Sequence, residues 1–264
     1  MLVDRRRYSK DNYVYLLVEG DSAALVDPGD AAVAIALAGA HGVRPQAILH
    51  THGHADHTGG TAEVKAAFGA VVHGHRGDTP LYPPDVGVDV DVDGRDWLEL
   101  GALRIRVHPA PGHTPGSVLY AWQGRLFTGD TIFWGGVGRC KYGDPEELAR
   151  TCGLEVARLD GALEVDPGHD YAENNLSFAL ELEPGNLAAR QALAEARAAQ
   201  AAGEEPRPTT LARERAVNPF LRPDAPAILD ALEARTGVRP RGAQEAFVAL
   251  RRLKDDWQYR PAPL

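Results

Sequence analysis

Four apolar, strand-like runs of this chain each lead into a turn that carries histidine or aspartate. The turns read THGHADH after QAILH, PGHTPGS after LRIRVHPA, TGDT after RLF and PGHD after ALEVD. In open α/β architectures, sites are assembled from residues that follow the ends of strands. This repeated pattern therefore predicts an α/β chain with one site built from four distant segments.

The first turn is the richest in metal-ligand side chains. Four of them fall within six positions: His52, His54, Asp56 and His57. Imidazole and carboxylate without thiolate suit Zn²⁺, Fe²⁺ or Mn²⁺ and argue against a structural zinc site of the finger type. In an extended segment His52 and His54 point the same way, whereas His57 diverges once the chain turns toward a helix. One loop then serves two metals.

Two metals need more ligands than this loop supplies. The later turns offer three: His113, Asp130 and His169. Taken alone, each is more simply a polar turn residue, but four segments with one pattern favour a shared site. Of the other histidines, His50 and His108 lie in or beside strand runs, where they are candidates to orient a ligand.

Composition excludes several classes of protein. A net charge of −9 disfavours a nucleic-acid partner, because phosphate backbones reward a basic face. No stretch approaches the roughly 20 apolar residues that span a bilayer, and the start, MLVDRRRYSKDNY, lacks the apolar core of a secretory signal. We expect a cytoplasmic protein whose Cys140 and Cys152 are reduced thiols.

The first two thirds of the chain alternate strand and helix patterns. Helices are expected at 30–40, at about 58–68 and at about 145–159, the last capped by Asp144. Strands are expected at 13–19, 23–27, 46–51, 70–73, 97–100, 103–108, 117–122 and 124–129. This mixture predicts two stacked sheets with helices outside.

From about residue 173 the strand patterns give way to helical ones. Helix-periodic segments cover 174–184, 186–203, 225–237 and 243–257. A proline-rich stretch, 204–210, separates the earlier from the later helices, and Thr209 or Thr210 is placed to cap a short helix at LARER. We expect a catalytic domain at 1–172 and a helical, substrate-binding domain at 173–264.

The motifs THGHADH, PGHTPGS, FTGDTIF and DPGHDY resemble those of the metallo-β-lactamase superfamily. Longer segments in the same order resemble its glyoxalase II (hydroxyacylglutathione hydrolase) family: GDTIFWGGVGRC, PGHDYAENNLSFALELEPGN, TLARERAVNPFLR and LRRLKDDW. The resemblance implies an α/β fold, the αββα sandwich of the superfamily, followed by a C-terminal all-helical domain.

The resemblance also implies a role for each candidate ligand. His52, His54 and His113 would hold a first metal. Asp56, His57 and His169 would hold a second, with Asp130 bridging the two. The implied cofactors are two divalent ions, zinc first, with iron or manganese as alternatives. Asp56 and Asp130 would be the catalytic side chains, Asp56 by orienting the nucleophile.

Members of this family bind glutathione through basic and aromatic side chains. The matching positions here are Arg139, Lys141, Tyr171, Arg251 and Lys254. Arg251 and Lys254 are three apart in a helix pattern and so share one face. The chain departs from the family at Cys140 and Lys141, where relatives often place an aromatic residue. Two alternatives follow: Lys141 supplies another charge, or Tyr142 reaches in from a shifted loop.

The activity implied is hydrolysis of S-D-lactoylglutathione, or a related 2-hydroxyacyl thioester, to glutathione and D-lactate by a metal-bridging hydroxide. This is the second step of methylglyoxal detoxification. The implied partner is this small molecule, with no nucleic acid, no membrane and a monomeric chain. Alternatives are a glutathione persulfide dioxygenase with a single iron, another hydrolase of the superfamily, and a protein that only stores or senses metal. Long helices after residue 173 favour the thioester hydrolase.

Overall fold

The computed structural model describes residues 1–262 as two stacked six-stranded sheets with helices around them. The first sheet has the order β1-β2-β3-β4-β5-β6. Its strands are β1 (Leu2–Tyr8), β2 (Asn12–Glu19), β3 (Ser22–Val26), β4 (Ala47–Leu49), β5 (Val71–Gly74) and β6 (Val90–Asp91). Strands β1 to β3 are antiparallel, and β3 to β6 are parallel.

The second sheet has the order β14-β13-β10-β9-β8-β7, with β10 and β13 parallel. Its strands are β7 (Trp97–Leu100), β8 (Leu103–Pro109), β9 (Val118–Trp122), β10 (Arg125–Gly129), β13 (Glu164–Pro167) and β14 (Thr209–Thr210). A small hairpin, β11 (Ile132–Phe133) and β12 (Gly136–Val137), follows β10. The parallel pair matters for function, because both of its strands end at the same edge.

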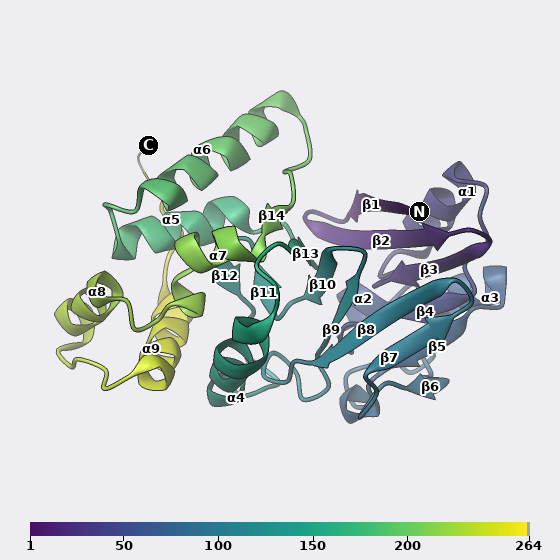
Figure 1. Ribbon diagram of the computed structural model, residues 1–264, viewed down its shortest axis with the longest axis horizontal. Helices are drawn as coiled ribbons and strands as arrows, with labels where there is room; N and C mark the ends of the chain where they lie inside the picture. The colour runs from purple at the N-terminus through teal and green to yellow at the C-terminus, as the bar shows by residue number, and fades with distance from the viewer. Residues whose placement is uncertain (263–264) are drawn as a thin grey trace.

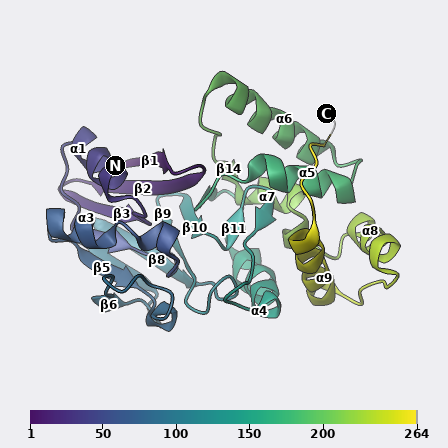
Figure 2. The same cartoon turned by 180° about the vertical axis from the view of Figure 1, so that it is seen from behind.

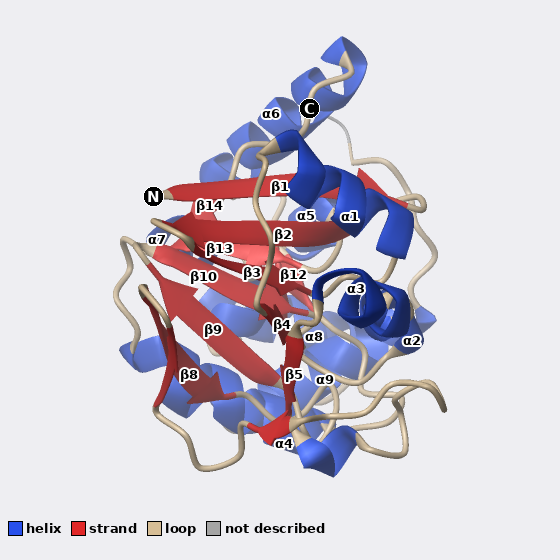
Figure 3. Ribbon diagram, turned by 90° about the vertical axis from the view of Figure 1, so that its right-hand side faces the viewer, coloured by secondary structure: helices blue, strands red, loops and turns tan. Residues whose placement is uncertain are grey.

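Strand β2 shows why the sheets stack. Alternate side chains of a strand point to opposite faces. Tyr15 packs into the core between the sheets, with its ring 5.2 Å from that of Phe127. Leu16 faces the other way, into a cluster with Leu37 of α1 (Ala31–Ala40) and Val64 of α3 (Thr61–Phe68). Both faces are therefore apolar, and Figure 3 shows the helices lying outside the first sheet.

The C-terminal helices gather beside the second sheet (Figures 1 and 2). They are α5 (Ala172–Leu182), α6 (Leu187–Ala202), α7 (Leu211–Val217), α8 (Pro226–Thr236) and α9 (Ala243–Asp256), and the earlier helix α4 (Pro145–Arg150) packs against α9. Leu176 and Leu193, on α5 and α6, belong to the same apolar cluster as the sheet interior. The division between 172 and 173 stays a prediction.

All eight expected strands are present, and the structure adds others. Strand β1 was not predicted, and β14 shows that strand structure does not end at residue 173. The helix expected at 145–159 is α-helical only as far as Arg150. The chain then forms a wider π turn, Thr151–Glu155, and a 3₁₀ turn, Val156–Arg158. Asp144 caps α4 and Thr210 caps α7, both as predicted. Within residues 1–262 no helix is long and apolar enough to cross a membrane.

Candidate metal centre

The four polar turns of the sequence meet at one end of the stacked sheets. The first follows β4 and enters α2 (Ala55–Thr58), and the second follows β8. Asp130 and His169 follow the parallel strands β10 and β13, so both leave the same sheet edge. All seven side chains predicted as ligands lie in two adjoining groups.

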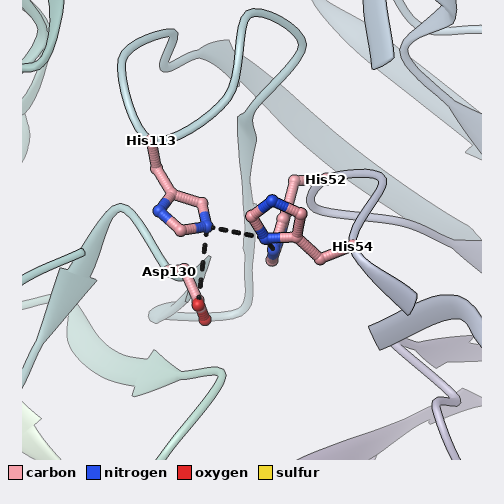
Figure 4. A group of neighbouring side chains, drawn as sticks. All are labelled: His52, His54, His113 and Asp130. Atoms are coloured by element: carbon pink, nitrogen blue, oxygen red, sulfur yellow. Dashed lines mark hydrogen bonds and ion pairs between the residues drawn. The ribbon is translucent and has the colours of Figure 1, made fainter. Parts of the chain in front are cut away.

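The first metal group contains His52, His54, His113 and Asp130 (Figure 4). Nδ1 of His54 lies 3.0 Å from Nε2 of His52 and 3.0 Å from Nε2 of His113. Asp130 Oδ2 lies 3.5 Å from the same atom of His113. Three ring nitrogens and one carboxylate oxygen therefore face one point.

The second metal group contains Asp56, His57 and His169. Nε2 of His57 lies 3.1 Å from Nε2 of His169 and 3.7 Å from Asp56 Oδ2. Asp130 reaches this group as well, with Oδ1 3.2 Å from His57 Nε2 and 3.5 Å from His169 Nε2. Its two oxygens thus face different groups, which is the arrangement of a carboxylate that bridges two ions.

The spacing and chemistry of these atoms fit divalent cations. Ligands about 2.0–2.1 Å from a tetrahedral zinc ion lie roughly 3.3 Å from one another. The contacts above match this separation, although two imidazole nitrogens that both expose lone pairs repel at such distances. Asp130 Oδ1 is buried and, in the described part of the chain, has only the imidazole nitrogens of His57 and His169 near it, with no hydrogen bond of normal geometry. Hydrogen bonding alone therefore leaves the site unsatisfied, and divalent ions held by these residues would satisfy it.

Buried carboxylates at the two metal groups also stabilise positive charge between them. Burial alone would lower the pKa of His57, but the Asp130 and Asp27 carboxylates outweigh it and raise that pKa well above its ordinary value. Burial alone would raise the pKa of Asp130, but His57 and His169 hold it well below its usual range. Burial lowers the pKa of His52, which keeps that ring neutral. An ionised carboxylate and a neutral imidazole are the forms that bind metal.

The far sides of three ligand rings are held by two aspartates that the sequence did not single out and by one backbone carbonyl. Asp27 Oδ2 lies 3.1 Å from His57 Nδ1, and Asp11 Oδ1 lies 2.9 Å from His169 Nδ1. The backbone carbonyl of Arg139 accepts from His113 Nδ1 at 2.6 Å. Such partners fix the ring orientation and tautomer of a metal ligand.

Asp27 has a sequence signal that could have revealed it. It follows the strand run AALV and precedes Pro28 and Gly29, the same arrangement as the other polar turns. Asp27 also accepts hydrogen bonds from the amide and hydroxyl of Thr51. Because its oxygens are already occupied, we assign it to support of His57 rather than to direct metal binding.

Two other histidines considered in the sequence lie away from the centre. His50 is buried and its Nε2 contacts Thr61 Oγ1 at 2.8 Å. His108 lies on β8, and neither ring contacts a predicted ligand among the interactions found in residues 1–262. The role proposed for them falls to Asp27 and Asp11.

A basic cavity of about 420 Å³ opens beside the two metal groups. His113 and Asp130 form part of its wall, and Arg139, Arg251 and Lys254 bring three cationic side chains to it. Tyr171 also lines it, with its ring stacked on His169 at 4.8 Å. The structure thus brings together four of the five residues predicted to bind substrate.

The fifth, Lys141, does not line this cavity. Its Nζ lies 5.0 Å from the centre of the Tyr142 ring, and that ring lies 5.4 Å from the ring of His54. Tyr142 does not line the cavity either, so both alternatives raised by the sequence stay predictions.

Helix α9 supplies the deepest cations of the basic cavity. Arg251 is 3% exposed and donates to the backbone carbonyl of Val137 at 2.9 Å. Lys254 donates to Asn174 and lies over the ring of Trp257 at 4.2 Å. Burial, with Arg251 and Arg139 nearby, lowers the pKa of Lys254 to about 7. Trp257 and Tyr259 also line this cavity, although the sequence did not single them out.

Comparisons with known proteins place both the sheet region and the C-terminal helices in one enzyme family. Residues 10–183 match the metallo-beta-lactamase superfamily, and residues 170–257 match the hydroxyacylglutathione hydrolase C-terminus. A hydroxyacylglutathione hydrolase of Anaeromyxobacter dehalogenans is 62% identical over 257 residues, 97% of this chain and 99% of the relative. One from Halorhodospira halophila is 40% identical over 248 residues, 93% and 95% of the two chains. The crystal structure of TTHA1623 in a di-iron-bound form has a TM-score of 0.58, with 27% identity over 80% of this chain and 95% of that one.

Proposed function

The chain belongs to the hydroxyacylglutathione hydrolase family of the metallo-β-lactamase superfamily, and we propose that it hydrolyses S-(2-hydroxyacyl)glutathione thioesters. The products are glutathione and a 2-hydroxy acid, with S-D-lactoylglutathione giving D-lactate. One observation carries the proposal: two metal groups that share Asp130 open onto a cavity lined by three basic side chains. The substrate pairs a reactive thioester with anionic carboxylates.

We infer that two divalent ions occupy the metal groups, with zinc as the first choice. His52, His54 and His113 would hold one ion and Asp56, His57 and His169 the other, with Asp130 between them. Iron remains an alternative, because the same donors accept it and the similar TTHA1623 structure is di-iron-bound. When bound, such a pair lowers the pKa of water toward neutrality and polarises a carbonyl.

The side chains themselves bind and orient the reactants. Asp56 is the most exposed of the charged ligands, with 54% of its side chain accessible, so we assign it to hydrogen bonding with the attacking water. Arg251, Lys254 and Arg139 attract the glycine carboxylate of glutathione. Binding energy from this remote end then positions the thioester carbonyl beside the metal groups.

A thioesterase assay tests the proposal. Purified protein is given S-D-lactoylglutathione and several other acyl thiols, and its metal content is measured on the same preparation. We expect hydrolysis of the glutathione thioester with two metal ions per chain. One iron per chain, with oxygen uptake on glutathione persulfide, would instead identify a dioxygenase. The cytoplasmic location and the monomeric state stay predictions.

Arg251→Ala is expected to raise KM for S-D-lactoylglutathione by about tenfold or more. A charge-assisted hydrogen bond contributes about 1.5–3 kcal/mol, and here it acts on a part of the substrate that does not react. We expect kcat to change little. Steady-state kinetics checks this, with Arg252→Ala as the control, because Arg252 is the exposed neighbour on the same helix. Equal KM values in the two variants would rule out Arg251 as an anchor.

The KM is also expected to depend on pH through Lys254. With a pKa of about 7, its ammonium is charged below that pH and neutral above it. An anionic substrate binds better to the charged form, so KM should rise as the pH is raised from about 6 to about 8.5. Lys254→Arg keeps its charge throughout and should flatten this dependence. If the variant retains the wild-type profile, another group is responsible.

A further inference from the structure

Asp78 is a buried carboxylate that belongs to neither metal group. It lies in the short 3₁₀ turn Arg76–Asp78, which follows β5, and its exposed fraction is 0%. Removal of a carboxylate from water is unfavourable unless hydrogen bonds replace its hydration. The partners of Asp78 therefore show what the chain uses it for.

Within residues 1–262, the Asp78 carboxylate has three hydrogen-bond partners, and all of them come from the two loops of the first metal group. Oδ2 accepts from the amide of Gly53 at 2.8 Å and from Thr114 Oγ1 at 2.6 Å. Oδ1 accepts from the amide of Gly116 at 2.7 Å. Gly53 lies between His52 and His54, and Thr114 follows His113. One carboxylate thus joins the loops that supply all three nitrogen ligands of this group.

The two glycines permit this close approach. A Cβ atom on Gly53 would lie 2.8 Å from Asp78 Cβ, and one on Gly116 would lie 2.8 Å from Asp78 Cγ. Contacts this short are not tolerated between carbon atoms without movement of the backbone. The sequence motifs THGHADH and HTPGS therefore need glycine at these positions for the carboxylate to bind both loops.

The second metal group is held differently. Asp11 supports His169, Asp27 supports His57, and Asn12 Nδ2 donates to Asp56 Oδ2 at 3.1 Å. No hydrogen bond found within residues 1–262 joins the Asp78 side chain to these ligands. Loss of Asp78 should consequently affect one group and spare the other.

We propose that Asp78 is a positioning residue that sets the distance between the His52–His54 pair and His113, and so sets the affinity of the first metal group for its ion. This rests on the ligand assignment under the proposed function. Asp78 touches neither ion nor substrate in this account. It acts by holding three imidazoles in a geometry that a divalent ion fills without moving either loop.

Asp78→Asn tests the proposal. The amide keeps the size of the side chain but loses its charge, and it places an NH₂ group against one of the three donors. Zn²⁺ affinities are measured by competition with a chromophoric chelator, on metal-free protein shown by circular dichroism to be folded. We expect one of two Zn²⁺ sites to weaken roughly tenfold to a hundredfold, while the other is unchanged. Two sites of wild-type affinity would overturn the proposal.

A control variant and a second test variant distinguish a role of Asp78 in positioning the ligand loops from a role in folding of the chain. Asp89 also accepts a backbone hydrogen bond, from the amide of Val72 at 2.8 Å, but lies away from the ligand loops. Asp89→Asn should lower stability without changing either Zn²⁺ affinity. If Asp78→Asn does not fold, Gly116→Ala displaces the same contact and should weaken one site only. Equal weakening of both sites in that variant contradicts the proposal.

These outcomes are independent of the activity. A wild-type protein that binds two Zn²⁺ ions but hydrolyses no acyl thiol would refute the proposed function and leave the role of Asp78 testable. A variant that retains two wild-type Zn²⁺ sites and hydrolyses thioester normally would refute only the role of Asp78.

Discussion

Asp130→Ala is expected to abolish thioester hydrolysis, with a loss in kcat/KM of more than two orders of magnitude. Replacement of a residue that only supports a metal ligand already lowers metal affinity or activity roughly tenfold to a hundredfold. Asp130 is more central, because Oδ2 lies 3.5 Å from His113 Nε2 and Oδ1 lies 3.2 Å from His57 Nε2. Both metal groups lose a ligand in this variant, and the negative charge between them disappears.

Elemental analysis and kinetics on the same preparation check this prediction. We expect Asp130→Ala to retain well under two metal ions per chain after gel filtration. Asp144→Ala is the matched control, because it removes an aspartate that only caps α4. Loss of such a cap costs about 1 kcal/mol of stability but touches no ligand. Wild-type turnover in Asp130→Ala would refute the bridging role.

Removal of metal is expected to abolish hydrolysis without unfolding the chain. The core between the sheets, with buried residues such as Tyr15 and Phe127, does not involve the metal groups. The ions nevertheless stabilise the fold by binding only the native state, by about 4 kcal/mol at a thousandfold excess over Kd. Chelation should therefore lower the midpoint of thermal unfolding while circular dichroism at room temperature stays native.

Adding Zn²⁺ back distinguishes loss of the metal from irreversible damage to the protein during chelation. Zn²⁺ added back to the chelated protein should restore both hydrolysis and the unfolding midpoint. The pKa of His57 is raised when no ion is present, so zinc binding at neutral pH should also release protons. A chelated protein that still hydrolyses thioester would show that the histidines do not carry the chemistry.

The fold was predictable where local pattern alone decides the structure. Strand β2 is apolar on both faces, and both faces are buried. Strand β1 was missed because it carries Arg5, Arg6 and Arg7 in succession. Its charges find partners far along the chain, such as Arg7 with Asp170 and Glu205, which no local pattern reveals.

The candidate ligands were predictable for the same reason. Each of the seven is a metal-binding residue type in a turn after an apolar strand, and a local pattern is enough to mark it. Asp78 also lies in a turn after an apolar strand, β5, but this pattern does not distinguish a ligand from a residue that supports one. Asp11 lacks the pattern, because β1, the strand before it, is charged. Lys141 shows the limit of alignment by motif. It matches a binding position of the family in sequence but does not line the cavity with the other four.

Anomalous diffraction from crystals grown with Zn²⁺ tests the central claim most directly. We predict two peaks roughly 3.5–4 Å apart, one among His52, His54 and His113 and the other among Asp56, His57 and His169. Each should lie about 2.0–2.2 Å from a different oxygen of Asp130. A single peak, or peaks that these seven side chains do not surround, would contradict the account.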